Sequence, residues 1–378
     1  MYPYNHLMDK FRYVCIMIGG FLGPFAGQSL SVVLPEFAAD FGISLELASL
    51  TMTAYMLPLA VTMLFSSYLV RNLRPAGVIR TAYLVIAVAA FVLVVTPVWW
   101  LFLVAFIVAA IGNAFTAPLL QQVLKHITPD DKLGQALGTY AAMQSFGLFS
   151  APLVAGVTSL VSWRLMYVFL AVFAVVIVIV RVPDVPASPP APGSRRFKLN
   201  WPIVRAMLTL LSVGTGVIGM SFIIALYVGD RFGAGPVTRG AIVMIGGLTA
   251  FIFARYVGGL ADKHGPRPVL AGGLIVAAVA LLAIAVSPWM ILIAVFWGIA
   301  VLAVQGTQVS MNMIVLRAPG GTQMLSTIQA FRFFGNSLTP IVILPLYNIH
   351  AWWAFLGAAC ILLVMAVVNI AGQRRTTT

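Results

Sequence analysis

The chain has 378 residues, of which 61% are hydrophobic and 8% are charged, and its mean hydropathy is +1.04. A soluble domain has about 25% charged residues, so this composition excludes a water-soluble globular protein and makes lipid the solvent for most of the chain. The formal net charge of +13 lies in short segments between apolar runs. With no soluble basic domain present, that charge is no sign of a nucleic-acid-binding protein.

Long apolar runs follow one another from the first residues to the last. A helix needs about 20 apolar residues to cross the hydrocarbon core, and continuous rather than alternating runs favour helices over strands. We therefore predict an all-α integral membrane protein with twelve transmembrane helices. The predicted spans are 13–35, 47–70, 77–97, 99–124, 134–160, 163–181, 203–228, 238–260, 268–287, 289–316, 322–348 and 351–371.

Basic residues are distributed very unequally between the two ends of these spans. Of the 22 Lys and Arg residues, 18 fall on the side of the N-terminus, and only Arg164, Arg231 and Arg239 fall on the other side. Arg332 lies inside a span. Because cytoplasmic segments carry the excess of basic residues, we expect a multi-pass protein of the cell (inner, cytoplasmic) membrane with both termini in the cytoplasm.

The longest segment between spans is rich in proline. Five prolines fall between residues 183 and 192, and such a segment is extended rather than helical. We predict a cytoplasmic linker over 182–202, which divides the chain into an N-terminal six-helix half (1–181) and a C-terminal six-helix half (203–378).

The two halves resemble each other when the second is shifted back by about 190 positions. The aligned pairs are Gly147 with Gly335, Pro152 with Pro340, Gln144 with Arg332, and Asn113 with Gln305. Repeated halves around a central axis are typical of secondary transporters, with the substrate site between the halves. We therefore predict a pseudo-symmetric arrangement.

The stretch GGLADKHGPRP, residues 258–268, concentrates charge between spans eight and nine. Its Gly258, Asp262, Lys263, Gly265 and Arg267 resemble the major facilitator superfamily signature G-x-x-x-D-[RK]-x-G-[RK]-[RK]. The resemblance implies a gating loop that holds the two halves shut on the cytoplasmic side. The alternative is a short turn whose charges serve only topology.

This segment departs from the signature at two places. Pro266 replaces a basic residue, and the corresponding first-half segment, RNLRPAGVI (71–79), has Arg71 where the acid belongs. The copy of the signature that the family usually has between spans two and three is therefore degenerate in this chain.

A second resemblance lies in span five. GLFSAPLVAG, residues 147–156, is similar to the antiporter signature G-x-x-x-G-P-x-x-G-G, with Gly147, Pro152 and Gly156 matching and Ala151 and Ala155 in place of glycines. Small residues permit close helix packing. In the family this signature marks exporters that exchange substrate for protons, so the resemblance implies the twelve-helix drug or metabolite:proton antiporter branch, which includes multidrug resistance.

Arg332 is the one charge deep within a span. It lies ten residues into span eleven, roughly 15 Å from the cytoplasmic end, and no carboxylate is predicted at that depth. Charges inside the bilayer are expensive and usually functional. Two readings stay open: Arg332 binds an anionic or carboxylated substrate, or it is structural and bonds to backbone and amide groups.

Uncharged polar side chains in other spans complete a candidate substrate cavity. For each of them alone an interhelical hydrogen bond is the expected role, and it is the group that indicates a cavity. These candidates are Gln28, Tyr55, Asn113, Gln144, Gln305, Gln308 and Asn336.

Proton coupling requires a group whose protonation changes during transport. All acids lie at span ends or in loops; Glu36 is the best candidate and Asp230 the next, whereas Asp40 and Glu46 are read as solvated loop acids. If none of them couples, the protein is a uniporter, or an anion exchanger or importer, for a small carboxylated or neutral solute.

Other classes find no support in the sequence. There is no G-x-x-x-x-G-K-[ST] nucleotide loop, no H-E-x-x-H and no G-x-S-x-G, so we expect neither an ATP-driven pump nor an enzyme, with no cofactor and no metal. The expected partners are a small-molecule substrate and the lipid bilayer, with no nucleic acid, and we expect a monomer. The function predicted is proton-coupled efflux of a drug or metabolite by alternating access.

Overall fold

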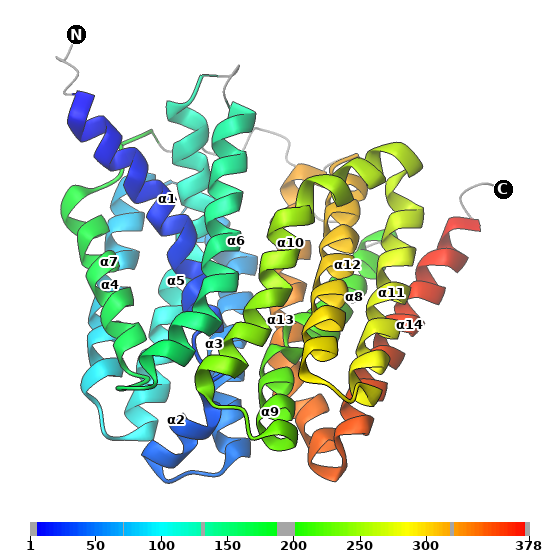
Figure 1. Ribbon diagram of the computed structural model, residues 1–378. Helices are drawn as coiled ribbons and strands as arrows, with labels where there is room; N and C mark the ends of the chain where they lie inside the picture. Colours follow the sequence, from blue (N-terminus) through cyan, green and yellow to red (C-terminus); the bar gives the residue numbers. More distant parts are fainter. Residues whose placement is uncertain (1–5, 71, 130–132, 187–200, 318–320, 375–378) are drawn as a thin grey trace.

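The computed structural model describes residues 6–70, 72–129, 133–186, 201–317 and 321–374, and all regular secondary structure in these ranges is helical (Figure 1). The elements are α1 (His6–Gln28), α2 (Leu34–Phe41), α3 (Leu45–Leu69), α4 (Pro75–Val95), α5 (Trp99–Ile127), α6 (Leu133–Thr158), α7 (Leu165–Val180), α8 (Trp201–Val213), the π-helix η2 (Gly214–Ile218), α9 (Met220–Phe232), α10 (Pro236–His264), α11 (Pro266–Val286), α12 (Met290–Arg317), α13 (Gly321–Ile349) and α14 (Ala351–Arg374).

Within the described residues, eight helical runs are long and apolar enough to cross a membrane. One of them, Trp201–Phe232, combines α8, η2 and α9. The chain is therefore an all-helical, multi-pass membrane protein, and the number of twelve spans stays a prediction. The other seven runs are Leu45–Ser66, Pro75–Val95, Trp99–Ile127, Pro236–Phe253, Pro266–Val286, Met290–Val315 and Ala351–Gly372.

Helix packing follows the same pattern in the two parts of the chain. We call α1–α7 the first half and α8–α14 the second half. The contacts α1–α6, α3–α5, α4–α5 and α4–α7 have the counterparts α8–α13, α10–α12, α11–α12 and α11–α14. The helices of the two halves therefore pack in the same order, while the division at the linker over 182–202 stays a prediction.

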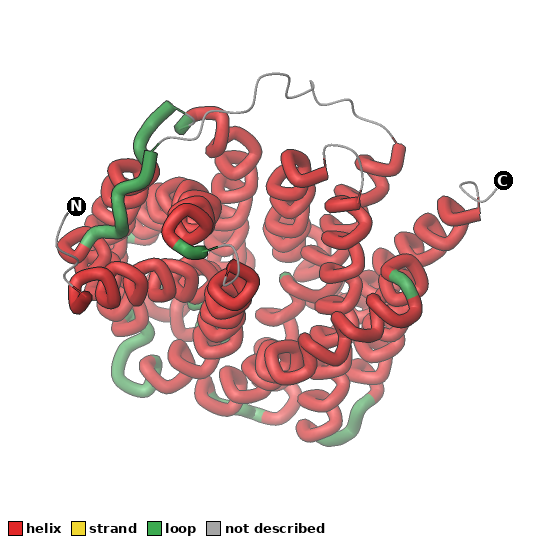
Figure 2. Tube along the Cα trace, turned by 90° about the horizontal axis from the view of Figure 1, so that it is seen from above, coloured by secondary structure: helices red, strands yellow, loops and turns green. Residues whose placement is uncertain are grey.

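Two seams join the halves: α6 packs against α10, and α3 packs against α13. Both chain termini lie toward one end of the bundle, and α2 lies at the opposite end, which we call the α2 side (Figure 1). Viewed from above, the two termini are on opposite flanks of the bundle (Figure 2). The seams place the centre of the molecule between helices from both halves.

The short helix α2 begins and ends for local reasons. Pro35 occupies the first turn, where its missing N–H costs nothing, and Gly42 ends the helix in the left-handed conformation with φ 62°. The hydroxyl of Ser44 then accepts the backbone N–H of Leu47 at 3.3 Å and caps α3. These two ends fix the position of Glu36 on the α2 side.

Several predicted boundaries differ from the structure. The first span was predicted to reach residue 35, but α1 ends at Gln28 and is followed by turns at 29–33 before α2. Span seven is interrupted by η2, which was not predicted. Residues 182–186 of the predicted linker are non-helical, as expected, whereas 187–200, and likewise Arg71, lie outside the described residues.

The segment predicted as a gating loop, residues 258–268, also differs from the prediction. Residues 258–264 continue α10, and the chain turns at the single residue Gly265, whose φ of 84° favours glycine, before α11 begins at Pro266. Lys263 therefore lies in the last turn of α10, where a basic residue interacts favourably with the helix dipole. Lys263 and Arg267 are exposed, whereas the burial of Gly258 and the side chain of Asp262 lie outside what the structure describes.

Candidate functional site

Two glycines at equivalent positions of the two halves allow close contact between neighbouring helices. A Cβ on Gly147 of α6 would lie 2.2 Å from the carbonyl oxygen of Phe21 on α1. A Cβ on Gly335 of α13 would lie 2.0 Å from the carbonyl oxygen of Leu211 on α8. Only glycine allows these approaches, and the residues three positions before them, Gln144 and Arg332, consequently occupy equivalent places.

Arg332 is half-buried near the middle of α13. Its guanidinium carbon lies 4.9 Å from the centre of the Phe333 ring, within the range of a cation–π contact. Among the described residues it makes no ion pair and no side-chain hydrogen bond. Its five N–H donors are therefore available to an acceptor such as a carboxylate.

A group of amides lies one turn from Arg332. Gln308 of α12 donates to Gln329 of α13 at 3.3 Å, and Gln329 donates to Asn312 in a short contact. Gln329 precedes Arg332 by three positions and shares its helix face. Gln305, half-exposed, lies one turn before Gln308. These side chains form a polar cluster of the second half, which we call the Arg332 cluster.

Sequence reasoning found Gln305, Gln308 and Arg332 but missed Gln329 and Asn312. The spacing of Gln308 and Asn312, four positions apart on one helix, was a usable signal, because such residues share a face. Gln329 gave no distinct signal, because several other polar residues precede it at the start of α13.

The first-half candidates are mainly engaged with one another. The Asn113 amide donates to the Tyr55 hydroxyl at 3.1 Å and accepts from Thr116 at 2.9 Å. Tyr55 is only 2% exposed. In this conformation the pair stabilises packing between α3 and α5, and of the first-half candidates Gln144 retains a half-exposed amide.

Gln28 and Asn336 are buried as well. Gln28 accepts a hydrogen bond from Ser221 of α9 at 3.2 Å, so it joins the two halves. Asn336 lies against η2, where a Cβ on Gly214 would come within 2.8 Å of its backbone nitrogen. Both side chains therefore belong to helix contacts in this conformation rather than to an open surface.

An ion pair crosses the seam on the α2 side. Glu36 of α2 accepts a short hydrogen bond from Arg239 of α10, and their side chains are 30% and 5% exposed. The second carboxylate oxygen of Glu36 and Nε of Arg239 are buried without a partner. Arg239 was assigned from sequence to the side opposite the N-terminus, and α10, which begins at Pro236, carries it into the seam on the α2 side.

The α3–α13 seam is also closed on the α2 side. The hydroxyl of Thr53 donates to the carbonyl of Ser337 at 2.7 Å, and Asn348 donates to Glu46 at 3.0 Å. Glu46 is exposed, as predicted for a solvated acid, and it also contacts the other half. The sequence could not show this, because Asn348 is 302 positions away.

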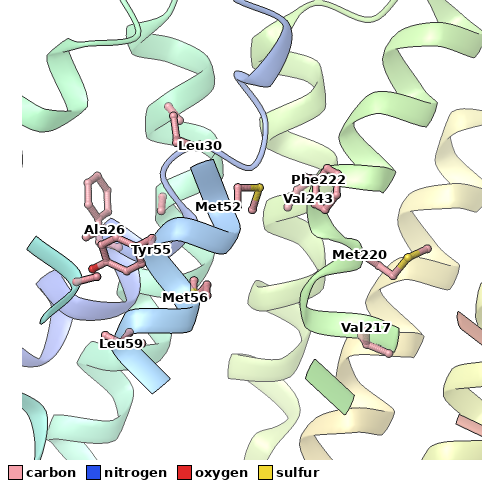
Figure 3. Close-up of a cluster of buried hydrophobic side chains, with 14 of the residues drawn as sticks. Ala26, Leu30, Met52, Tyr55, Met56, Leu59, Val217, Met220, Phe222 and Val243 are labelled. Carbon is pink, nitrogen blue, oxygen red and sulfur yellow. The ribbon is translucent and has the colours of Figure 1, made fainter. Parts of the chain in front are cut away.

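Apolar side chains fill the space between these polar contacts. Met52 and Met56 of α3 lie on one side of the centre, and Val217, Met220 and Phe222 of the second half lie on the other (Figure 3). All five are buried. The α2 side is therefore sealed by an apolar core flanked by polar contacts.

The residues of the antiporter-like motif pack α6 against its neighbours. A Cβ on Gly156 would lie 2.5 Å from the carbonyl oxygen of Pro236, and one on Gly240 would lie 2.4 Å from that of Pro152. Gly156 and Pro152 thus form the α6–α10 seam, while Gly147 contacts α1. Small residues are needed here for close approach of the two halves.

Asp40 and Asp230 each contact a residue of their own half. Asp40, read from sequence as a solvated acid, pairs with Arg164 at 2.8 Å, and Arg164 also donates to the carbonyl of Thr96 at 2.6 Å. Asp230 accepts from the Tyr347 hydroxyl at 2.7 Å. Neither contact crosses a seam, which separates them from Glu36.

No group of three or more His, Cys, Asp or Glu side chains that could hold a metal occurs in the described ranges. The geometry defines a multi-pass membrane protein with two similar halves, a polar cluster between central helices and one sealed side. Those are the properties of a membrane transport protein.

A family model places the chain more closely. The model described as "Major Facilitator Superfamily" matches residues 16–323. The chain therefore belongs to the major facilitator superfamily, a family of transporters rather than enzymes.

Curated relatives match part of the chain. It is 26% identical over 162 residues to the uncharacterized MFS-type transporter YcnB of Bacillus subtilis (strain 168), covering 43% of this chain and 34% of that protein. It is 24% identical to the riboflavin transporter RibZ of Clostridioides difficile (strain 630), covering 38% and 32%. It is 23% identical to the lincomycin resistance protein LmrB of B. subtilis (strain 168), covering 38% and 30%. The matched region thus spans about a third of each relative.

Solved structures share the fold over nearly the whole chain. A POT family transporter in complex with a thioalcohol-conjugated peptide has a TM-score of 0.80 at 11% identity, covering 97% of this chain and 96% of that one. The human organic anion transporter MFSD10 (TETRAN) has a TM-score of 0.70 at 12% identity, covering 96% and 99%. At such identities these similarities concern the fold alone.

Proposed function

We propose that this protein is a secondary transporter that exports a small organic solute, a drug or metabolite, in exchange for protons. One observation carries the proposal. Thr53–Ser337, Gln28–Ser221, Glu36–Arg239 and Glu46–Asn348, together with the close contacts of Gly156 and Gly240, join the two halves in the part of the helices nearer the α2 side. Halves joined by such contacts at one end have the arrangement expected of one state of alternating access.

The proposed orientation puts the α2 side outside and both termini in the cytoplasm, as the basic residues indicate. In that orientation twelve spans cross the cell membrane, the structure faces inward, and the Arg332 cluster is approached from the cytoplasm. The printed names of RibZ and LmrB, a riboflavin transporter and a lincomycin resistance protein, support an organic solute as cargo. We propose that the protein works as a monomer.

Glu36 is the best group for proton coupling in this scheme. Its carboxylate is held by Arg239 across the seam. When the outer side opens, the two side chains separate, and a proton then competes with Arg239 for the carboxylate. Asp230 is less suited, because its partner Tyr347 belongs to the same half.

A second candidate function is transport of an organic anion without proton exchange. It is favoured by Arg332, which has no acidic partner among the described residues and would otherwise leave its charge uncompensated. Under this alternative the guanidinium binds a carboxylate of the solute, and the amides of Gln308 and Gln329 add hydrogen bonds.

The test uses inverted vesicles with an inside-acid gradient, followed by a pH-sensitive dye during addition of neutral, cationic and carboxylated compounds. Arg332→Gln is compared with Arg231→Gln, a control arginine that contacts Tyr227 on the α2 side. Loss of a charge-assisted contact worth about 1.5–3 kcal/mol predicts a roughly 10- to 100-fold higher KM for carboxylated compounds in Arg332→Gln only.

Each outcome separates the candidates. Collapse of the gradient by a compound establishes proton exchange. Uptake of a labelled carboxylate without collapse contradicts proton coupling and favours the anion carrier. Equal KM values in Arg332→Gln and Arg231→Gln would show that Arg332 is structural.

A further inference from the structure

A groove of about 620 Å³ lies on the outer surface of the first half, away from the central helices of the second half. One stripe of α4, including Gly77, Thr81 and Val85, forms one wall. A stripe of α5, including Ile111 and Phe115, forms the other. The spacing of three, four and seven residues puts each stripe on a single helix face.

The groove is apolar and runs along α4 and α5. From Gly77 to Val85 it extends about 12 Å along α4, which is most of one leaflet of a hydrocarbon core about 30 Å thick. Val85 and Ile111 are 36% and 40% exposed. Both helices are among the runs that are apolar enough to span a membrane, so this surface faces lipid chains.

Charge is concentrated where the groove ends, at the turn between α3 and α4. Arg74 lines this end, and its side chain is 75% exposed. The segment 71–80 contains three arginines and no acid. Arg74 pairs with Asp184 at 3.0 Å, but Asp184 is also 57% exposed, and such surface pairs contribute little stability.

We propose that this groove binds an anionic phospholipid, with one acyl chain between α4 and α5 and the phosphate at Arg74. A guanidinium binds phosphate through parallel hydrogen bonds. The excess of arginine favours a lipid with net negative charge over a zwitterionic one, whose headgroup already neutralises its own phosphate. The site is separate from the transport site and does not depend on the proposed function.

The experiment measures binding of phosphatidylglycerol and of phosphatidylcholine with identical chains to the purified full-length protein by native mass spectrometry. Gly77→Leu fills the groove, since no atom lies within 4 Å of the added Cβ. Arg74→Gln removes the cation. Gly272→Leu on α11 is the matched control, because its Cβ also meets open space.

We expect Gly77→Leu to weaken phosphatidylglycerol binding by about tenfold, as displacement of about two methylene groups predicts. Arg74→Gln should abolish the preference over phosphatidylcholine, and Gly272→Leu should bind like wild type. Unchanged binding by Gly77→Leu or equal binding of both lipids by wild type overturns the proposal.

Discussion

Glu36→Gln removes the charge of the carboxylate that faces Arg239 across the α2-side seam. Removing one member of a buried ion pair costs about 3–5 kcal/mol, whereas exposed pairs contribute about 0–1 kcal/mol. Arg239 is 5% exposed and Glu36 30%, so an intermediate loss of about 2 kcal/mol is reasonable. This loss falls on the sealed conformation, and it should raise the ratio of outward-open to sealed molecules about 30-fold.

Spin labels measure that ratio directly. Leu160, in the turn between α6 and α7, and Ile349, at the end of α13, are 69% and 73% exposed and both lie on the α2 side. Labelled cysteines at these positions, with Cys15 and Cys360 replaced by serine, report the distance between the halves by pulsed electron resonance. The population at longer distance should increase in Glu36→Gln.

The matched control is Asp40→Asn, which breaks the pair with Arg164 inside the first half. It should leave the distance distribution unchanged. Exchanging the charges, Glu36→Arg with Arg239→Glu, should restore the sealed population. The reasoning is refuted if Glu36→Gln and Asp40→Asn give the same distribution as wild type.

Two further predictions concern glycines. Gly240→Ala places a Cβ 2.4 Å from the carbonyl oxygen of Pro152 across the seam, so the distance between the spin labels should lengthen. Gly259→Ala, whose Cβ meets open space, should leave that distance unchanged. Equal distances in both variants would contradict a tight α6–α10 seam. Gly335→Ala forces α13 away from Leu211 inside the second half and should lower the free energy of unfolding by about 1–3 kcal/mol. Thermal denaturation in detergent measures this loss. An unchanged midpoint would show that α8 and α13 can separate at this point without losing stability.

The similarity of the two halves and the equivalence of Gly147 and Gly335 could be predicted from the sequence. The alignment of Gly147 with Gly335 rested on a weak match, yet both glycines admit a neighbouring carbonyl oxygen at the same depth. Periodic apolar runs and small residues are local properties, so a single sequence displays them. The equivalence of Gln144 and Arg332 in the two halves followed from the same alignment.

The contacts across the seams were beyond sequence reasoning. Glu36 and Arg239 are 203 positions apart, and nothing near either residue indicates the other. Burial of Tyr55 and Gln28 likewise depends on which helix face meets a partner, and nearly uniform hydrophobicity hides that face. In a membrane protein both lipid-facing and buried faces are apolar, which removes the amphipathic signal that a soluble helix offers.

The π-turn in the seventh predicted span changes how its residues should be mapped. The N–H of Gly219 donates to the carbonyl of Gly214 at 2.8 Å, five positions back, instead of four. One additional residue in a turn rotates all following side chains by about 100° relative to a regular helix. A helical-wheel projection started at Trp201 would therefore assign Met220, Phe222 and their neighbours to the wrong direction. Cysteine-accessibility scans along this span need two separate wheels, one ending at Val213 and one beginning at Met220.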